Sequence, residues 1–363
     1  MGLLGLSGCG SPSSASVEMS SQTELVKTGS MELQYAENFA VDYYEDGYKM
    51  LTTLPDSKRY LIVPEGQPVP RGLDEDVSIL QEPLQNIYLV ASGVMDMFAS
   101  VDAVDQIRFS GQKQENWYIQ TAKDAMAAGD MIYAGKYSKP DYELLVSEGC
   151  DLAIENRMIT HSPEVVEMLQ SFGIPVMIEY SSYEQHPLGK VEWVKFFGAL
   201  TGKEAFAEQT EILEKVERGE KTGKTIAFFY VTSNGLIQVR QSTDYIPKLI
   251  ELAGGRYIFE DLEDSGSGRS TLNMQVEDFY AGAKDADILI YNSSIDGGVT
   301  TLDELIGKCN ILKDFKALQE GQVYCTTNDM YQQSMAIGYL LQDMHTVLTD
   351  DDTAKLRYLF LLQ

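Results

Sequence analysis

The sequence predicts an α/β fold in which two doubly wound, parallel-sheet lobes are joined by one long backbone helix. Three observations lead to this prediction. Short apolar runs alternate with segments of helical period over residues 35–186, the alternation restarts at residue 223, and between the two stretches apolar residues recur at helical spacing. Repeated strand–helix alternation is typical of a parallel sheet with helices on both faces. Each stretch is therefore expected to fold as its own lobe.

The segment 1–34 precedes the first lobe and has the character of a processing signal followed by a tether. A short apolar run ends in Leu6-Ser7-Gly8-Cys9, and residues 10–29 are rich in serine and other polar residues. The run is too short to cross a bilayer, and its end fits the bacterial lipobox, in which the cysteine is acylated. We expect a truncated signal, lipidation of Cys9 and a flexible tether, so that acyl chains hold the protein at the cell membrane.

The first lobe is expected over residues 35–186 and should begin with a β-hairpin. Residues 36–63 alternate apolar and polar around an Asp46-Gly47 turn, and 58–63 has the pattern of a third strand. Further along, apolar runs predict strands, and helical period predicts helices. The strands are expected at 87–91, 151–156 and 174–180, and the helices at 114–128 and 162–172.

The connecting helix is expected over residues 187–222. Its helical pattern runs from 189 to 221 with only glycines inside it, which would give a helix about 45 Å long. The second lobe, residues 223–363, repeats the plan of the first. Its strands are expected at 225–231, 255–259, 287–292 and 322–325, and its helices at 244–253 and 331–348. Two lobes on one helix leave a cleft between them.

The charge of the chain excludes one class of partner. It has 28 Lys and Arg against 55 Asp and Glu, which gives a formal net charge of −27. Such a chain is repelled by nucleic acid and by anionic lipid headgroups. No run of about 18 to 20 apolar residues predicts a transmembrane helix.

Motifs for direct metal binding and for catalysis are missing from the sequence. The three histidines His161, His186 and His345 are far apart, and the cysteines after Cys9 form no CxxC pair. There is no GxSxG elbow, no GxxxxGK[ST] phosphate loop and no GxGxxG after the first strand of a lobe. These absences favour a binding protein over an enzyme, with no resident cofactor and no metal ligands of its own.

Three stretches of the sequence resemble one known family. They are PDYELLVSEGCDLAIEN at 140–156, MQVEDFYAGAKDADILIYN at 274–292 and SSYEQHPLGKVEWVKFFGALTGKE at 181–204. Together with the lipobox, they resemble the class III, helical-backbone substrate-binding lipoproteins of ABC importers that carry iron–siderophore complexes, haem and corrinoids. The resemblance covers roughly residues 35 to 348. The family often has Pro-Asp before the two strands, whereas this chain has Cys150-Asp151 and Ala286-Asp287.

The resemblance implies a function, a location and partners. The protein would be an extracytoplasmic, lipid-anchored monomer that captures a metal chelate and delivers it to an ABC permease dimer with its ATPase subunits. In the family, one glutamate per lobe pairs with arginines of the permease, and the matching positions here are Glu143 and Glu277. Both lie where a helix is expected to start, and the simpler alternative is that they are solvated helix-end charges.

The cleft residues follow from the fold, because ligands in doubly wound sheets bind beyond the carboxyl ends of strands. Arginine and aromatic side chains in the loops there suit a bulky, planar, anionic complex. The candidate ligand-binding residues are Arg108, Trp117, Tyr118, Arg157, Tyr183, Tyr230, Arg240 and Asn292.

Other functions remain open at this point. A surface adhesion or structural lipoprotein of the same fold would need no cargo, and a direct metal-ion binding protein would bind zinc or manganese. If haem is the cargo, a tyrosine or histidine would ligate its iron. Neither the cargo nor the redox state of Cys150, Cys309 and Cys325 follows from the sequence.

Overall fold

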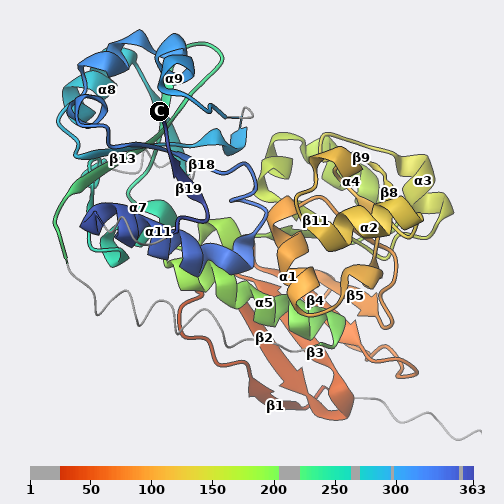
Figure 1. Ribbon diagram of the computed structural model, residues 1–363. Helices are drawn as coiled ribbons and strands as arrows, with labels where there is room; N and C mark the ends of the chain where they lie inside the picture. Colours follow the sequence, from red (N-terminus) through yellow and green to blue (C-terminus); the bar gives the residue numbers. More distant parts are fainter. Residues whose placement is uncertain (1–24, 204–220, 263–269, 296–297, 351–354) are drawn as a thin grey trace, which may run out of the picture.

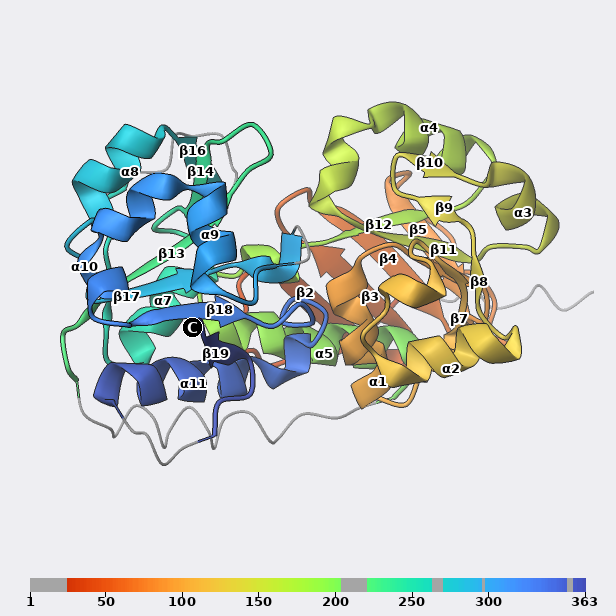
Figure 2. The same cartoon turned by 45° about the horizontal axis from the view of Figure 1, so that its top comes forward.

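The computed structural model describes residues 25–203, 221–262, 270–295, 298–350 and 355–363. Within these ranges two α/β lobes lie beside each other, and helix α5 (Pro187–Thr201) runs along both of them (Figures 1 and 2). The expected lipobox with Cys9 and most of the expected tether lie outside the described residues, as does 204–220 of the expected connecting helix.

The first lobe is built on a parallel five-stranded sheet in the order β12-β11-β6-β7-β8. Ile87 and Leu89 face one hydrophobic core and Tyr88 faces another, because successive side chains of a strand point to opposite faces. Helices α1, α2 and α5 supply residues to the first core, and α3 and α4 supply the second. The elements are β6 (Ile87–Leu89), α1 (Met95–Ser100), β7 (Ile107–Ser110), α2 (Gln120–Ala128), β8 (Ile132–Tyr133), α3 (Tyr142–Ser147), β11 (Leu152–Asn156), α4 (Pro163–Ser171) and β12 (Val176–Glu179).

The second lobe has a mixed sheet rather than the fully parallel one that the sequence predicts. Strands β13, β15, β17 and β18 are parallel, but β14, β16 and β19 pair antiparallel at the two sides. The difference arises because β14 returns from β13 through a tight turn, where no crossover helix fits. The elements are β13 (Thr225–Val231), β14 (Ile237–Arg240), α7 (Tyr245–Leu252), β15 (Arg256–Tyr257), β16 (Thr271–Met274), α8 (Val276–Ala283), β17 (Ile288–Tyr291), α9 (Leu302–Lys308), α10 (Lys316–Gln319), β18 (Val323–Thr326), α11 (Ile337–Thr349) and β19 (Leu359–Leu361).

A separate five-stranded sheet precedes the first lobe. The expected hairpin and third strand are β2, β3 and β4, and β1 and β5 extend them to the order β1-β2-β3-β4-β5. One face of this sheet packs on α5, where Phe39 contacts Trp193 and Phe196 edge-on. The strands are β1 (Lys27–Ser30), β2 (Phe39–Tyr44), β3 (Lys49–Thr53), β4 (Lys58–Val63) and β5 (Val77–Gln81); a short hairpin within the first lobe adds β9 (Gly135–Lys136) and β10 (Lys139–Pro140).

Helix α5 joins the hydrophobic cores of the two lobes. Leu188 and Val191, near its start, pack into the core of the second lobe, whereas residues from Trp193 onward pack into that of the first. The helix ends earlier than the sequence predicts, because Gly202 caps it in a left-handed conformation (φ 72°). The prediction of one continuous helix about 45 Å long is therefore wrong, because α5 ends at Thr201.

The chain that enters β2 is bound to α5 by buried carboxylates. Glu192 of α5 accepts hydrogen bonds of 2.8 to 3.1 Å from the backbone N–H groups of residues 34–36, and its other partner is the Lys195 ammonium at 2.7 Å. Glu184, just before α5, accepts from the next two N–H groups and from the Trp193 indole. A Cβ on Gly189 would lie 2.8 Å from the Tyr35 carbonyl oxygen, so glycine permits this close approach.

Candidate functional site: a cavity between the lobes

A cavity of about 390 Å³ lies between the lobes at the carboxyl ends of β6, β11 and β12. Each of these strands ends in a 3-10 turn, at Ser92–Val94, Arg157–His161 and Ser181–Tyr183, and all three turns contribute to the wall. Parallel strands end at one edge of a sheet, so their loops meet there, as the sequence predicts for the loops after 151–156 and 174–180. The lining residues are Ala91, Ser92, Gly93, Asn156, Arg157, Met158, Glu179, Ser182, Tyr183, Lys190 and Tyr331.

The first-lobe wall presents an arginine stacked on a tyrosine. The Arg157 guanidinium lies over the Tyr183 ring, 4.7 Å from its centroid. Asn156 begins the turn that carries Arg157, and its side chain accepts the Met158 N–H at 2.9 Å. Two of the five candidates from this lobe, Arg157 and Tyr183, thus meet at the cavity; that they contact a ligand stays a prediction.

On the second-lobe side the cavity is lined by Tyr331, a residue that was not predicted from the sequence. Arg240 and Asn292 both donate to its hydroxyl oxygen, Asn292 at 2.9 Å. Arg240 also pairs with Asp244 at 3.3 Å, so the guanidinium is held from two sides. Arg240 and Asn292 therefore position a cavity residue from behind and do not themselves line the cavity. The sequence predicts a helix from residue 331, but α11 begins at Ile337 and leaves Tyr331 in the preceding loop.

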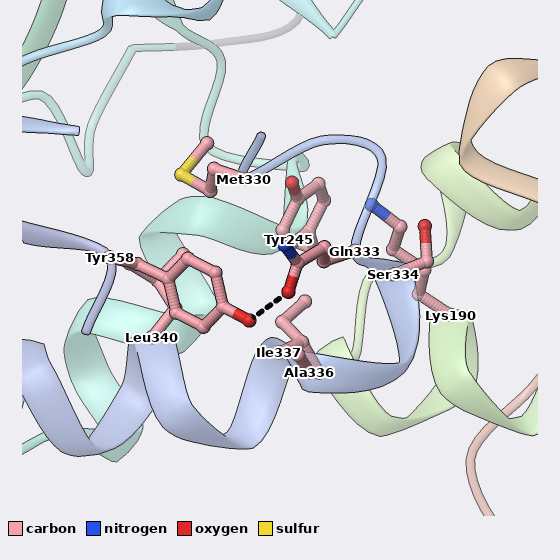
Figure 3. A pocket seen from close by; sticks show the side chains of 9 residues that line it. All are labelled: Lys190, Tyr245, Met330, Gln333, Ser334, Ala336, Ile337, Leu340 and Tyr358. Carbon is pink, nitrogen blue, oxygen red and sulfur yellow. Dashed lines mark hydrogen bonds between the residues drawn. The ribbon is translucent and has the colours of Figure 1, made fainter. Parts of the chain in front are cut away.

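The floor of the cavity contains two buried charged residues, Lys190 of α5 and Glu179 at the end of β12. The Glu179 carboxylate accepts from the Ser181 N–H at 2.8 Å and from its hydroxyl at 2.5 Å, while burial raises its pKa above the usual range. The Lys190 ammonium lies 4.6 Å from the centroid of the Tyr245 ring. Lys190 also lines a second, very small cavity of about 10 Å³ near Ser334, beside the Tyr358–Gln333 hydrogen bond (Figure 3).

The loop that carries Tyr331 also fastens the second lobe to the first. The Gln332 side-chain amide accepts from the Tyr118 N–H and donates to the Asn116 carbonyl, each at 2.8 Å. Asp96 of α1 accepts the Met335 N–H at 2.8 Å. Three hydrogen bonds thus hold residues 332–335 against the first lobe, and they set the position of Tyr331 relative to Arg157.

Besides Arg240 and Asn292, four more sequence-predicted ligand residues do not line this cavity. The prediction for Arg108 is corrected, because its guanidinium is engaged elsewhere. It donates to the Gly129 and Asp130 carbonyls, at 2.8 and 3.0 Å, and pairs with Glu148. The prediction that Trp117 lies at the ligand site is also corrected, because Trp117 is fully buried in the first-lobe core and its indole donates to Ser110. The Arg108 contacts lie at the amino ends of β8 and β11, opposite the cavity, and the Trp117 ring is packed inside the core. The other two are Tyr118, whose ring is exposed, and Tyr230, whose ring lies near that of Tyr291.

The two candidate docking glutamates occupy equivalent places in the two lobes. Glu143 is the second residue of α3 and Glu277 the second residue of α8, and both are exposed. The helices lie at the outer ends of the lobes (Figure 2). The aspartate after each helix is structural: Asp151 accepts two N–H groups just before β6, and Asp287 accepts from Thr225, the first residue of β13. These aspartates join neighbouring strands where the family often has Pro-Asp.

Among the described residues, no group of three or more His, Cys, Asp and Glu side chains could hold a metal ion. Cys150 and Cys309 are free thiols, and Cys309 and Cys325 are buried. In the same part of the chain no helix combines the length and apolar character needed to cross a membrane.

Comparison with known proteins agrees with this architecture. No family model matches the chain. An uncharacterised lipoprotein of Methanocaldococcus jannaschii is 25% identical over 353 residues, which covers 87% of this chain and 81% of the relative. A periplasmic haem-binding protein from Pseudomonas aeruginosa superposes with a TM-score of 0.56 at 10% identity, over 77% of this chain and 98% of that one. A protein of an ABC-type Fe3+-hydroxamate transport system from Saccharomonospora viridis gives 0.55 at 15%, over 73% and 93%. The chain thus has the α/β fold of the class III solute-binding proteins.

Proposed function

We propose that this chain is the extracytoplasmic solute-binding component of an ABC importer, which captures a bulky metal chelate between its lobes. The observation that carries the proposal is the inter-lobe cavity, where Arg157 and Tyr183 face the same space as Tyr331 of the other lobe. Its volume lies in the range of small-molecule sites, and its mixture of guanidinium, phenol and hydroxyl groups suits oxygen-rich, partly aromatic ligands. An iron–siderophore, haem or a corrinoid has this chemistry.

The N-terminal sequence and a relative support the proposed location. Cys9 behind Leu-Ser-Gly would carry the acyl chains, and a relative over most of the chain is named a lipoprotein. A soluble two-lobed domain on a lipid anchor stays at the membrane surface, where it can meet a permease. Capture and release need no covalent chemistry, so the proposed role is that of a binding protein and not of an enzyme.

Docking to the permease dimer is proposed for Glu143 and Glu277. The exposed, equivalent positions of the two carboxylates suit a partner with two-fold symmetry, with one contact per lobe. Replacing both by lysine should abolish uptake of the cargo by cells and leave its affinity for the purified protein unchanged. The matched control is the double change Glu148→Lys and Asp278→Lys, at exposed neighbours. Normal uptake by the Glu143/Glu277 variant would refute the docking assignment.

The cargo is tested by calorimetric titration of the full chain with Cys9→Ala, which removes the thiol that would be acylated. The titrants are ferric hydroxamate and catecholate siderophores, haem, cobalamin, Zn²⁺ and Mn²⁺. Saturable binding of one chelate class with a Kd at or below micromolar supports the proposal. Binding of the free ions alone would favour a metal-ion binding protein. If the folded protein binds none of the titrants, an adhesion or structural lipoprotein is favoured.

A further inference from the structure

Lys190 is a buried cation without a direct counter-ion among the residues that the structure describes. The residue is 3% exposed, lies in the first turn of the inter-lobe helix α5 and lines the 390 Å³ cavity. In the described part of the chain its ammonium has no hydrogen-bond acceptor and no carboxylate oxygen within 4.0 Å; its neighbour is the Tyr245 ring, with the centroid at 4.6 Å. Its side chain extends from α5 toward the residue 330–336 loop (Figure 3).

The carboxylates around Lys190 are already engaged by other donors. Asp96 accepts the Met335 N–H, Glu179 accepts both donors of Ser181, and Asp244 accepts from Arg240 and from the Ile246 N–H. Burial raises the pKa of all three carboxyls despite the attraction of the lysine. None of them therefore serves as a close ion-pair partner for the ammonium.

An unpaired charge in a protein interior is costly unless a partner of opposite sign reaches it. The cavity that Lys190 lines also contains Arg157, so two cations and one carboxylate face the same space in a chain of net charge −27. Among the residues that line the cavity, positive charges outnumber negative ones, which is the opposite of the net charge of the whole chain. It matches a ligand that brings anionic oxygens.

We propose that the cargo carries an anionic oxygen group, held at the floor of the cavity by Lys190 with Arg157 beside it. This inference rests on the proposed function and narrows it to anionic chelates, such as a ferric catecholate or a porphyrin with free carboxylates. A neutral hydroxamate chelate would leave the ammonium without a partner. Lys190 is then the residue that selects for charge, and Tyr183 and Tyr331 contact the body of the ligand.

The experiment compares matched probes that differ in charge. These are iron protoporphyrin IX against its dimethyl ester, and a trianionic ferric tris-catecholate against a neutral ferric tris-hydroxamate. We expect the anionic member of at least one pair to bind at least tenfold more tightly, and this preference to shrink as NaCl rises from 50 to 500 mM. Lys190→Met should weaken the anionic member at least tenfold and the neutral one less than threefold, while Lys190→Arg should retain most of the preference.

The control is Lys248→Met, a change of a partly exposed lysine on α7 that pairs with Glu251 and does not line this cavity. Equal binding of both members of each pair by the wild type, or no effect of Lys190→Met on the anionic probe, would overturn the inference and leave the importer role standing. Failure of all four probes to bind would overturn this inference, and the titration with cobalamin described above would then decide the metal-chelate role separately. If Lys190→Met fails to fold, the wild-type preference and its salt dependence still decide.

Discussion

Glu155 of β11 provides a sharp test of the electrostatics of the first lobe. The residue is fully buried, and both of its carboxylate oxygens lack a hydrogen-bond partner among the described residues. Burial alone raises its pKa from 4.5 to about 8. Tyr88 and Tyr142 lie nearby, and neither donates a hydrogen bond to the carboxyl: the Tyr88 hydroxyl donates to the Gly135 carbonyl.

The sign of the pH effect follows from the direction of this change. Between pH 4.5 and about 8 the unfolded chain has lost the Glu155 proton and the folded chain retains it, so folding takes up a proton. The free energy of unfolding should therefore fall as the pH rises through this interval. At 1.36 kcal/mol per pKa unit, the free energy of unfolding should change by roughly 5 kcal/mol over the full interval.

Denaturant unfolding of the wild type and of Glu155→Met at pH 5, 6, 7 and 8 measures this contribution. Methionine has a similar volume and needs no hydrogen bond. We therefore expect the free energy of unfolding of the variant, relative to that of the wild type, to rise by about 1 kcal/mol for each unit of increasing pH. The matched control is Glu164→Met at an exposed position of α4, which should give a difference that is flat with pH. A flat difference for Glu155→Met as well would show that the carboxyl is solvated in the folded protein, and would refute the reasoning.

Two further predictions concern the inter-lobe helix and the cavity. Glu192→Ala should lower the free energy of unfolding by about 3 kcal/mol, because it leaves three backbone N–H groups without their acceptor and removes the carboxylate that pairs with the Lys195 ammonium. Burial opposes the charged form of Glu192, but the hydrogen bonds it accepts hold its pKa below the usual 4.5. The stabilisation should therefore decline as the pH falls below 4.5 and through the lowered pKa of the folded protein; an unchanged urea midpoint at pH 7 would contradict this role. Tyr331→Phe removes the hydroxyl to which Arg240 and Asn292 donate, and should weaken chelate binding by about tenfold with the melting temperature changed by only a few degrees. Equal Kd values for the variant and the wild type in calorimetry would show that Tyr331 does not contact the ligand.

The arrangement of strands was accessible from the sequence because buried strands leave apolar runs. The runs that contain β6, β11, β13 and β17 locate the sheets of both lobes, and the loops after two first-lobe runs do line the cavity. The separate sheet of β1 to β5 was seen only in part. Its edge strand β1 consists of exposed residues, so no alternation marks it.

The details of the site were harder to predict because they depend on tertiary contacts. In GKVEWVKFF the residues Lys190 and Glu192 look like the solvated positions of an amphipathic helix, yet α5 is covered on all sides and both are buried. Tyr331 follows no apolar run and is placed by hydrogen bonds to residues distant in sequence. Gly202 was the one available signal for the true end of α5, since a glycine after a helical run is typical of a left-handed cap.

The attachment of residues 34–38 to Glu184 and Glu192 has a mechanical consequence. The chain between β1 and β2 is fastened to the helix whose residues pack into the hydrophobic cores of both lobes. Because β1 itself pairs with β2, a pull on the chain upstream of β1 is carried by the leading sheet and by α5, and not by the outer helices of either lobe.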